Sequence, residues 1–198
     1  NFRTRVDQTV TSWLDVGVNV LVSRYTRSSS DTNAFFQAFV NPPVYNIYND
    51  SNKVAYPEKF DSPQLYGFGN SYANPYAVAR YNENSEKGTN LVFSTYAQLS
   101  LLDGKLKMKT SYNLDMQFYR TQGYVPEYFV GGSQGVSVST LTKIYGLSDS
   151  HIIDNTITYT DLIGRHSFSV MAGQSTRIER FSAMNGSGIN VPAYDSQS

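Results

Sequence analysis

The stretch that decides the fold is residues 91–118, which read LVFSTYAQLSLLDGKLKMKTSYNLDMQF. Apolar and polar residues alternate with a period of two on both sides of Asp103-Gly104. One set of alternate positions is mainly apolar: Leu91, Phe93, Thr95, Ala97, Leu99 and Leu101, then Leu106, Met108, Thr110, Tyr112, Leu114, Met116 and Phe118. Side chains of a strand alternate between its faces, and Asp-Gly suits a tight turn. The stretch therefore predicts an antiparallel hairpin with one apolar face.

Two further pairs of strands follow the same pattern. Residues 2–10 and 14–25 alternate on either side of Thr11-Ser12-Trp13, and residues 153–159 and 168–174 flank a turn near residues 161–165. The alternation in residues 14–25 is about twice as long as a usual strand of five or six residues. A tilted strand needs about 9–11 residues to cross a bilayer. We expect six strands of membrane-crossing length.

The connections between these pairs are long and polar. They cover residues 26–88, residues 121–148, and the chain from Ser182 onward, and the first contains Asn41-Pro42-Pro43. Compact soluble domains seldom contain structureless loops this long. Tight turns on one rim and long loops on the other are typical of outer-membrane barrels. We therefore predict an all-β fold, a transmembrane antiparallel β-barrel, of which this chain supplies about six strands.

The composition excludes several other classes. The 198 residues contain 16 basic and 16 acidic side chains, so no excess of positive charge favours binding of nucleic acid. The sequence has no cysteine, which excludes a disulfide framework. No run of about 18 apolar residues occurs, which excludes a transmembrane helix. Asn1-Phe2-Arg3-Thr4 already alternates and does not resemble a signal peptide. We expect the chain to be an excerpt of a longer mature protein.

Several segments, in this order, resemble SusC/RagA-type TonB-dependent transporters. The resemblance is carried by residues 1–19 with Trp13-Leu14-Asp15-Val16-Gly17, by Asn74-Pro75-Tyr76-Ala77, by the turn Leu102-Asp103-Gly104-Lys105, and by residues 155–174. It covers nearly the whole chain.

This resemblance implies a 22-stranded barrel in the outer membrane of a Gram-negative bacterium. Residues 1–198 would then form part of one TonB-dependent receptor barrel domain, whose plug and remaining strands lie outside this chain. The implied function is active import of glycans or oligopeptides with a SusD-like surface lipoprotein, powered by TonB. The implied contacts are therefore that lipoprotein, TonB, the plug, outer-membrane lipid and the substrate.

No arrangement of catalytic residues stands out, so we predict no enzymatic activity, no cofactor and no resident metal. His151 and His166 are the only histidines, and a lone histidine near a strand end is more often a surface residue than a ligand. Acidic pairs such as Asp149 with Asp154, or Asp50 with Glu58, could chelate calcium, but solvated loop charges are the favoured interpretation. No substrate-binding residue is assigned.

Two groups of side chains carry functional hypotheses. The loop tyrosines suit contacts with sugar or peptide, although packing among the loops is the favoured alternative: Tyr45, Tyr48, Tyr56, Tyr66, Tyr72, Tyr76 and Tyr81. Charged residues of the polar set would face the lumen and contact the plug, or simply make the wall polar: Arg3, Arg5, Lys107, Lys109 and Asp115. Aromatic residues near strand ends would form two interfacial girdles: Trp13 and Tyr159 at one rim, Tyr25, Phe118, Tyr119 and Phe181 at the other.

Two other classes compete with the importer. One is a secreted β-sandwich that binds carbohydrate, for which solubility without detergent would be evidence. The other is a passive porin or an enzymatic barrel. The sustained apolar face and the alternation of short turns with long loops favour the importer over the sandwich.

Overall fold

The computed structural model describes residues 1–29, 31 and 33–192. The chain divides into two compact units, and each is described by itself. The first unit comprises Asn1–Tyr25, Gly88–Tyr119 and Gly146–Ala183. The second comprises Thr26–Lys87, Arg120–Tyr145 and the chain from Met184 onward.

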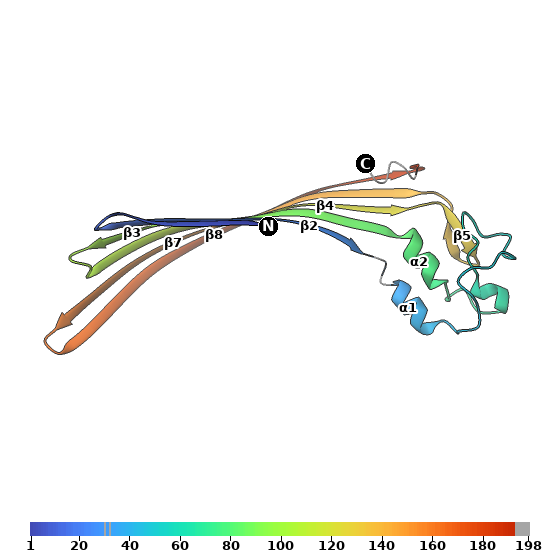
Figure 1. The fold of residues 1–198 in the computed structure, drawn as a ribbon, viewed down its shortest axis with the longest axis horizontal. Helices are drawn as coiled ribbons and strands as arrows, with labels where there is room; N and C mark the ends of the chain where they lie inside the picture. The colour runs from blue at the N-terminus through green and yellow to red at the C-terminus, as the bar shows by residue number, and fades with distance from the viewer. Residues whose placement is uncertain (30, 32, 193–198) are drawn as a thin grey trace. The chain divides into compact units, whose positions relative to one another are not determined.

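The dominant element is one six-stranded antiparallel sheet with the strand order β1-β2-β3-β4-β7-β8. Its strands are β1 (Phe2–Thr11), β2 (Leu14–Ser29), β3 (Glu83–Leu101), β4 (Leu106–Val125), β7 (Thr140–Ile163) and β8 (His166–Ile189) (Figure 1). The expected all-β class and the six strands are confirmed. Within the described residues the sheet is open, with β1 and β8 at its edges.

The strands extend further than the alternation predicted. β2 continues to Ser29, β4 to Val125 and β8 to Ile189, while β7 already begins at Thr140. The predicted long connections at 121–148 and after Ser182 are therefore largely strand; residues 193–198 lie outside the described residues. The sequence missed these extensions because the polar residues near the strand ends interrupt the apolar alternation.

The first hairpin has the register that the alternation requires. Val6 pairs with Val18, whereas Arg5 pairs with Asn19. Residues directly opposite each other share a face of the sheet. The apolar sets of β1 and β2 therefore lie on one face and the polar sets on the other.

The turn between β3 and β4 also follows the prediction. Gly104 has φ 84° and Asp103 has φ 52°, so the Asp-Gly pair supplies positive φ where the chain reverses. Leu102 is left-handed as well, with φ 54°. A leucine in this region is unfavourable, and the alternation gave no sign of it.

Side-chain contacts extend the two faces across the rest of the first unit. On the apolar face, the rings of Phe93 and Tyr112 lie 6.2 Å apart, and those of Tyr159 and Phe168 lie 5.9 Å apart. These contacts place even positions of β4 and β8 beside odd positions of β3 and β7. The term apolar face is used below for this surface.

The opposite surface, the polar face, is defined by a second set of contacts. The Tyr96 hydroxyl donates to Asp7 at 3.0 Å, and Lys109 lies 4.6 Å from the Tyr96 ring centroid. Ser175 donates to Asp154 at 2.6 Å between β8 and β7.

Three tyrosines of the polar face lie flat over glycines of the neighbouring strand. A Cβ atom at Gly17 would lie 2.2 Å from Tyr96, at Gly88 2.3 Å from Tyr25, and at Gly146 2.2 Å from Tyr119. Each ring fills the space that a side chain would otherwise take. Tyr25 and Tyr119 were expected in an outer girdle; that expectation is wrong, because both belong to the polar face.

The connection between β2 and β3, expected to be structureless, is folded together with the connection between β4 and β7. It contains α1 (Asn33–Val40), η1 (Pro63–Tyr66) and α2 (Pro75–Tyr81), and the second connection contributes β5 (Tyr128–Gly131) and β6 (Gln134–Val136). We call residues 33–81 and 126–136 the loop body. No helix in the described part of the chain has the length and apolarity needed to cross a membrane.

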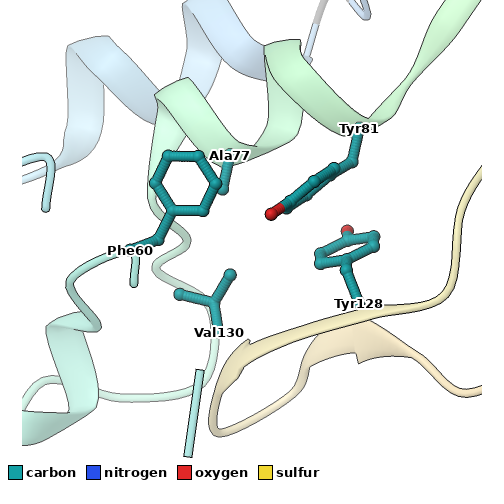
Figure 2. Packing of buried hydrophobic residues seen from close by; sticks show 5 residues of the cluster. All are labelled: Phe60, Ala77, Tyr81, Tyr128 and Val130. Atoms are coloured by element: carbon teal, nitrogen blue, oxygen red, sulfur yellow. The ribbon is translucent and has the colours of Figure 1, made fainter. Parts of the chain in front are cut away.

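A small aromatic core holds the loop body together. Phe60, Ala77, Tyr81, Tyr128 and Val130 are buried and face one another (Figure 2). The rings of Tyr81 and Tyr128 stack at 4.3 Å, and Phe60 meets Tyr81 edge-on at 5.4 Å. Two connections that are remote in sequence thereby share one core.

Candidate functional site: two strand faces and a folded loop body

The apolar face is not uniformly apolar. The Tyr112 hydroxyl lies 2.7 Å from His151 Nδ1, and His151 Nε2 lies 2.9 Å from an Asp149 carboxylate oxygen. Thr110 donates to Asn155 at 2.9 Å between the same two strands, β4 and β7. Each of these five polar side chains has a hydrogen-bond partner on its own face. These hydrogen bonds reduce the free-energy cost of placing polar groups among apolar neighbours.

Two predictions from the sequence concern residues in this region: His151 as a lone histidine, and Asp149 with Asp154 as an acidic pair. His151 is held between the Tyr112 hydroxyl and the Asp149 carboxylate. Asp149 shares the apolar face with His151, whereas Asp154 lies on the polar face with Ser175. The structure therefore does not bring Asp149 and Asp154 together.

One group of charges on the polar face lies around Tyr96. Arg5 pairs with Asp7 at 2.6 Å, Asp7 accepts from Tyr96, and Lys109 lies over the Tyr96 ring. The charged residues predicted to face the lumen occupy the strand positions that point to this face: Arg3, Arg5, Lys107, Lys109 and Asp115. Contact of these residues with a plug stays a prediction.

A buried carboxylate organises the loop body. Asp61 is fully buried, and its carboxylate accepts hydrogen bonds from the amides of Asn46 (3.1 Å) and Ser62 (3.0 Å), from the Asn49 side chain (2.9 Å) and from the Tyr66 hydroxyl (2.8 Å). Four donors replace the water that such a charge loses on burial. This arrangement fixes residues 46–66 around one side chain.

Asn74 connects that centre to α2 and to β6. Its side-chain oxygen accepts from the amides of Tyr76 and Ala77 and so caps the helix, while its nitrogen donates to the carbonyl of Asp61 at 2.9 Å. Asn74 and Gln134 also exchange two hydrogen bonds of 2.7 and 3.0 Å through the Asn74 backbone. The polar network thus ties the two connections to each other.

The predicted loop tyrosines mostly pack within the loop body. Tyr81 is buried in the core, Tyr48 stacks on Phe60 at 4.9 Å, and Tyr56 stacks on Phe129 at 6.4 Å. Burial, with the nearby charge of Asp61, raises the pKa of Tyr45 to about 12. The hydrogen bond to Asp61 likewise raises the pKa of Tyr66. Tyr48, Tyr56, Tyr66 and Tyr76 are nevertheless 49%, 42%, 44% and 46% exposed, so contact with sugar or peptide and packing among the loops both stay predictions.

Three exposed aromatic side chains of α1 were missed by the sequence analysis. On α1, Phe35 is 80%, Phe36 59% and Phe39 89% exposed, whereas Gln37 of the same helix is buried. Gln37 donates to the Ser71 carbonyl and accepts from the Ala73 amide. The helix therefore turns its phenylalanines outward. The available signal was the helical spacing in NAFFQAFV, which lies inside a segment taken as a loop.

Among the described residues, no three His, Asp or Glu side chains are grouped so that they could hold a metal ion. Glu58 pairs with Arg80 at 3.3 Å rather than with Asp50.

These features define a class: a six-stranded antiparallel sheet of long amphipathic strands, some joined by short turns and others by connections that contain a folded body. No family model matches the sequence, and no curated protein matches it. Solved structures do match it. A chain in the structure of the RagAB peptide importer in the "open-open" state aligns with 94% of this chain at 17% identity and a TM-score of 0.65.

A chain in the structure of the RagAB peptide transporter aligns with 95% of this chain at 16% identity and a TM-score of 0.66. At this identity the likeness shows the fold alone. The present chain spans about a fifth of those chains, 20% and 21% respectively.

Proposed function

We propose that residues 1–198 are one stretch of the barrel wall of a SusC-like, TonB-dependent importer in the outer membrane of a Gram-negative bacterium. The carrying observation is the two-faced sheet, whose apolar and polar sets keep their sides across six long strands. The fold likeness to chains of the RagAB peptide importer supports it. The chain would contribute its part of a single barrel domain.

The two faces then have separate tasks. The apolar face contacts lipid hydrocarbon, and the polar face lines the lumen and receives the plug. Six strands cannot enclose such a lumen, so this segment works only with the remaining strands. Import proceeds by capture, TonB-driven movement of the plug and passage, without any bond chemistry.

Oligopeptides are the first substrate class to test, because the similar structures are described as peptide importers; glycans are the second. The experiment is uptake of labelled oligopeptides by intact cells with and without the full-length gene, alongside separation of inner and outer membranes. Outer-membrane recovery with gene-dependent uptake is the expected result. Recovery in the soluble fraction would overturn the proposal.

The exposed phenylalanines of α1 are the proposed docking point for a SusD-like surface lipoprotein. Exposed aromatic clusters are typical of interaction surfaces. We expect Phe35→Ser with Phe39→Ser to reduce co-purification of the lipoprotein with the full-length importer. Val54→Ser with Leu65→Ser, which removes two other exposed apolar side chains of the loop body, is the matched control. Equal recovery of the lipoprotein in both variants would contradict the assignment.

A further inference from the structure

We propose that the loop body carries a binding site for one pyranose ring of a glycan. Four side chains of the second unit form it: Tyr48, Tyr76, Glu58 and Arg80. The proposal rests on the proposed function and deepens it, because it assigns a substrate class and its contact residues to the loop body.

The ring of Tyr48 is held on one face and open on the other. Residues 48 and 60 form an antiparallel bridge, and the rings of Tyr48 and Phe60 stack with centroids 4.9 Å apart and an interplanar angle of 19°. Phe60 belongs to the buried core of the loop body (Figure 2), whereas Tyr48 is 49% exposed. The inner face of the Tyr48 ring therefore rests on the core, and its outer face points away from the core.

Tyr76 lies beside this stack and does not cover the outer face of Tyr48. The centroid of its ring is 5.9 Å from that of Tyr48 and also 5.9 Å from that of Phe60. A ring placed on the outer face of Tyr48 would be much farther from Phe60 than from Tyr48. Tyr76 is itself 46% exposed, so its ring adds a side wall to the open face of Tyr48.

An ion pair lies near the hydroxyl end of the Tyr48 ring. Arg80 Nε is 3.3 Å from Glu58 Oε1, and the two side chains are 52% and 35% exposed. Arg80 follows Tyr76 by four residues on α2, so both side chains lie on the same side of the helix. The pKa of Tyr48 is raised first by burial and then by the hydrogen bond with Tyr76 and the charge of Glu58, whereas the charge of Arg80 lowers it. The Tyr48 hydroxyl therefore has a second hydroxyl, a carboxylate and a guanidinium close to it.

An open ring face with these polar groups along one edge matches the chemistry of a pyranose. A pyranose has C–H groups on its faces, which stack on an aromatic ring, and hydroxyl groups around its rim. A carboxylate accepts hydrogen bonds from such hydroxyls and a guanidinium donates to them, and hydrogen bonds with charged groups are the stronger ones. An apolar side chain of a peptide would use the ring face but not the polar edge. A protein partner typically contacts about 20–30 residues, whereas this group has four side chains.

The test measures binding of the purified full-length importer in detergent to a printed array of neutral, acidic and amino-sugar oligosaccharides, with an array of oligopeptides beside it. Tyr48→Leu keeps an apolar cover over Phe60 and removes the stacking face, whereas Tyr48→Phe keeps the face and loses only the hydroxyl. Glu58→Gln removes a charge from the polar edge and conserves the size of the side chain. The matched control is Tyr56→Leu, because Tyr56 is another exposed tyrosine that stacks on a phenylalanine and donates to a glutamate.

We expect Tyr48→Leu and Glu58→Gln each to weaken binding of the best-bound oligosaccharide about tenfold, and Tyr48→Phe to weaken it about threefold. Tyr56→Leu should leave binding unchanged. Retained binding by Tyr48→Phe would show that the loop body still folds when residue 48 is replaced. Absence of any bound oligosaccharide, equal losses in Tyr48→Leu and Tyr56→Leu, or binding of oligopeptides alone would overturn the inference.

Membrane fractionation separates failure of this inference from failure of the proposed function. An outer-membrane protein that takes up oligopeptides and binds no oligosaccharide overturns this inference alone. Recovery outside the outer membrane overturns the proposed function itself.

Discussion

Val18 lies opposite Val6 on the apolar face, about midway along the apolar run of β2. We expect Val18→Arg to destabilise the full-length barrel by about 2–4 kcal/mol, because a cation at the bilayer midplane loses its hydration. The measurement is urea-dependent unfolding of the full-length protein in lipid vesicles.

The control for that substitution is Ser94→Arg on β3. Ser94 lies two residues before Tyr96 on the same strand, so its side chain points to the polar face. An arginine at this position should therefore be tolerated. If both variants lose the same stability, the assignment of the two faces is wrong, since a shift of one residue exchanges them.

Gly17 permits the flat position of Tyr96 on the polar face. Gly17→Ala would place a methyl group 2.2 Å from that ring. The ring must then move and lose its hydrogen bond to Asp7, and we expect a cost of about 1–3 kcal/mol. Tyr96→Ala should relieve this clash, so the double variant should cost less than the sum of the single ones in the same unfolding assay. Simple additivity would contradict the steric explanation.

Tyr45 makes the stability of the loop body sensitive to alkaline pH. Its pKa is about 12 in the folded state against about 10 in an unfolded chain, so the folded state keeps a proton that the unfolded chain releases. The stabilisation is therefore complete below pH 10 and is lost as the pH rises through 12. Near-UV circular dichroism melts between pH 9 and 12 measure this loss.

Tyr45→Phe is the variant that tests the pH prediction. The Tyr45 hydroxyl has no hydrogen-bond partner among the described residues, so its removal should cost little at pH 8 and should reduce the alkaline loss. Tyr66→Phe, which removes the hydrogen bond to Asp61, should instead cost about 1–2 kcal/mol at pH 8. A larger loss of stability at pH 8 for Tyr45→Phe than for Tyr66→Phe would contradict the roles assigned to the two hydroxyl groups.

At the scale of elements, Asn74 joins a helix, a turn and a short strand. Asn74→Ala removes the cap of α2 and the donor to the Asp61 carbonyl, and we expect it to destabilise the loop body by about 2–4 kcal/mol. Hydrogen exchange of the full-length protein should show the whole loop body, residues 33–81 and 126–136, losing its protection together. The β1–β2 hairpin should keep its protection. Loss confined to α2 would show that the two connections are not one body.

The elements also show which local signals were sufficient. The β3–β4 hairpin and the register of β1 with β2 follow from period-two alternation and from the Asp103-Gly104 turn, because both signals are local. The loop body has no such signal. Asp61 and Gln134 lie in connections that the alternation predicted to be polar loops, yet both are buried. The Asp61 carboxylate accepts from residues within 15 positions of it, whereas Gln134 bonds to Asn74, 60 residues away.

For the whole molecule, we expect this segment expressed alone to be insoluble in water without detergent. The apolar face and the two sheet edges at β1 and β8 would be exposed, and open edges promote aggregation. Sedimentation with and without detergent measures this. A soluble, monomeric segment would favour the secreted carbohydrate-binding sandwich, although the described residues contain one large sheet and only a two-stranded second one.

The sequence by itself determined the fold class, the six strands, the two faces and the short turns, because alternation along a strand fixes which side each residue occupies. Only the tertiary structure decided that the loops share a core, that Tyr25 and Tyr119 lie over glycines on the polar face, and that α1 exposes its phenylalanines. Each of these depends on partners brought together from distant parts of the chain. A local pattern carries no information about such partners.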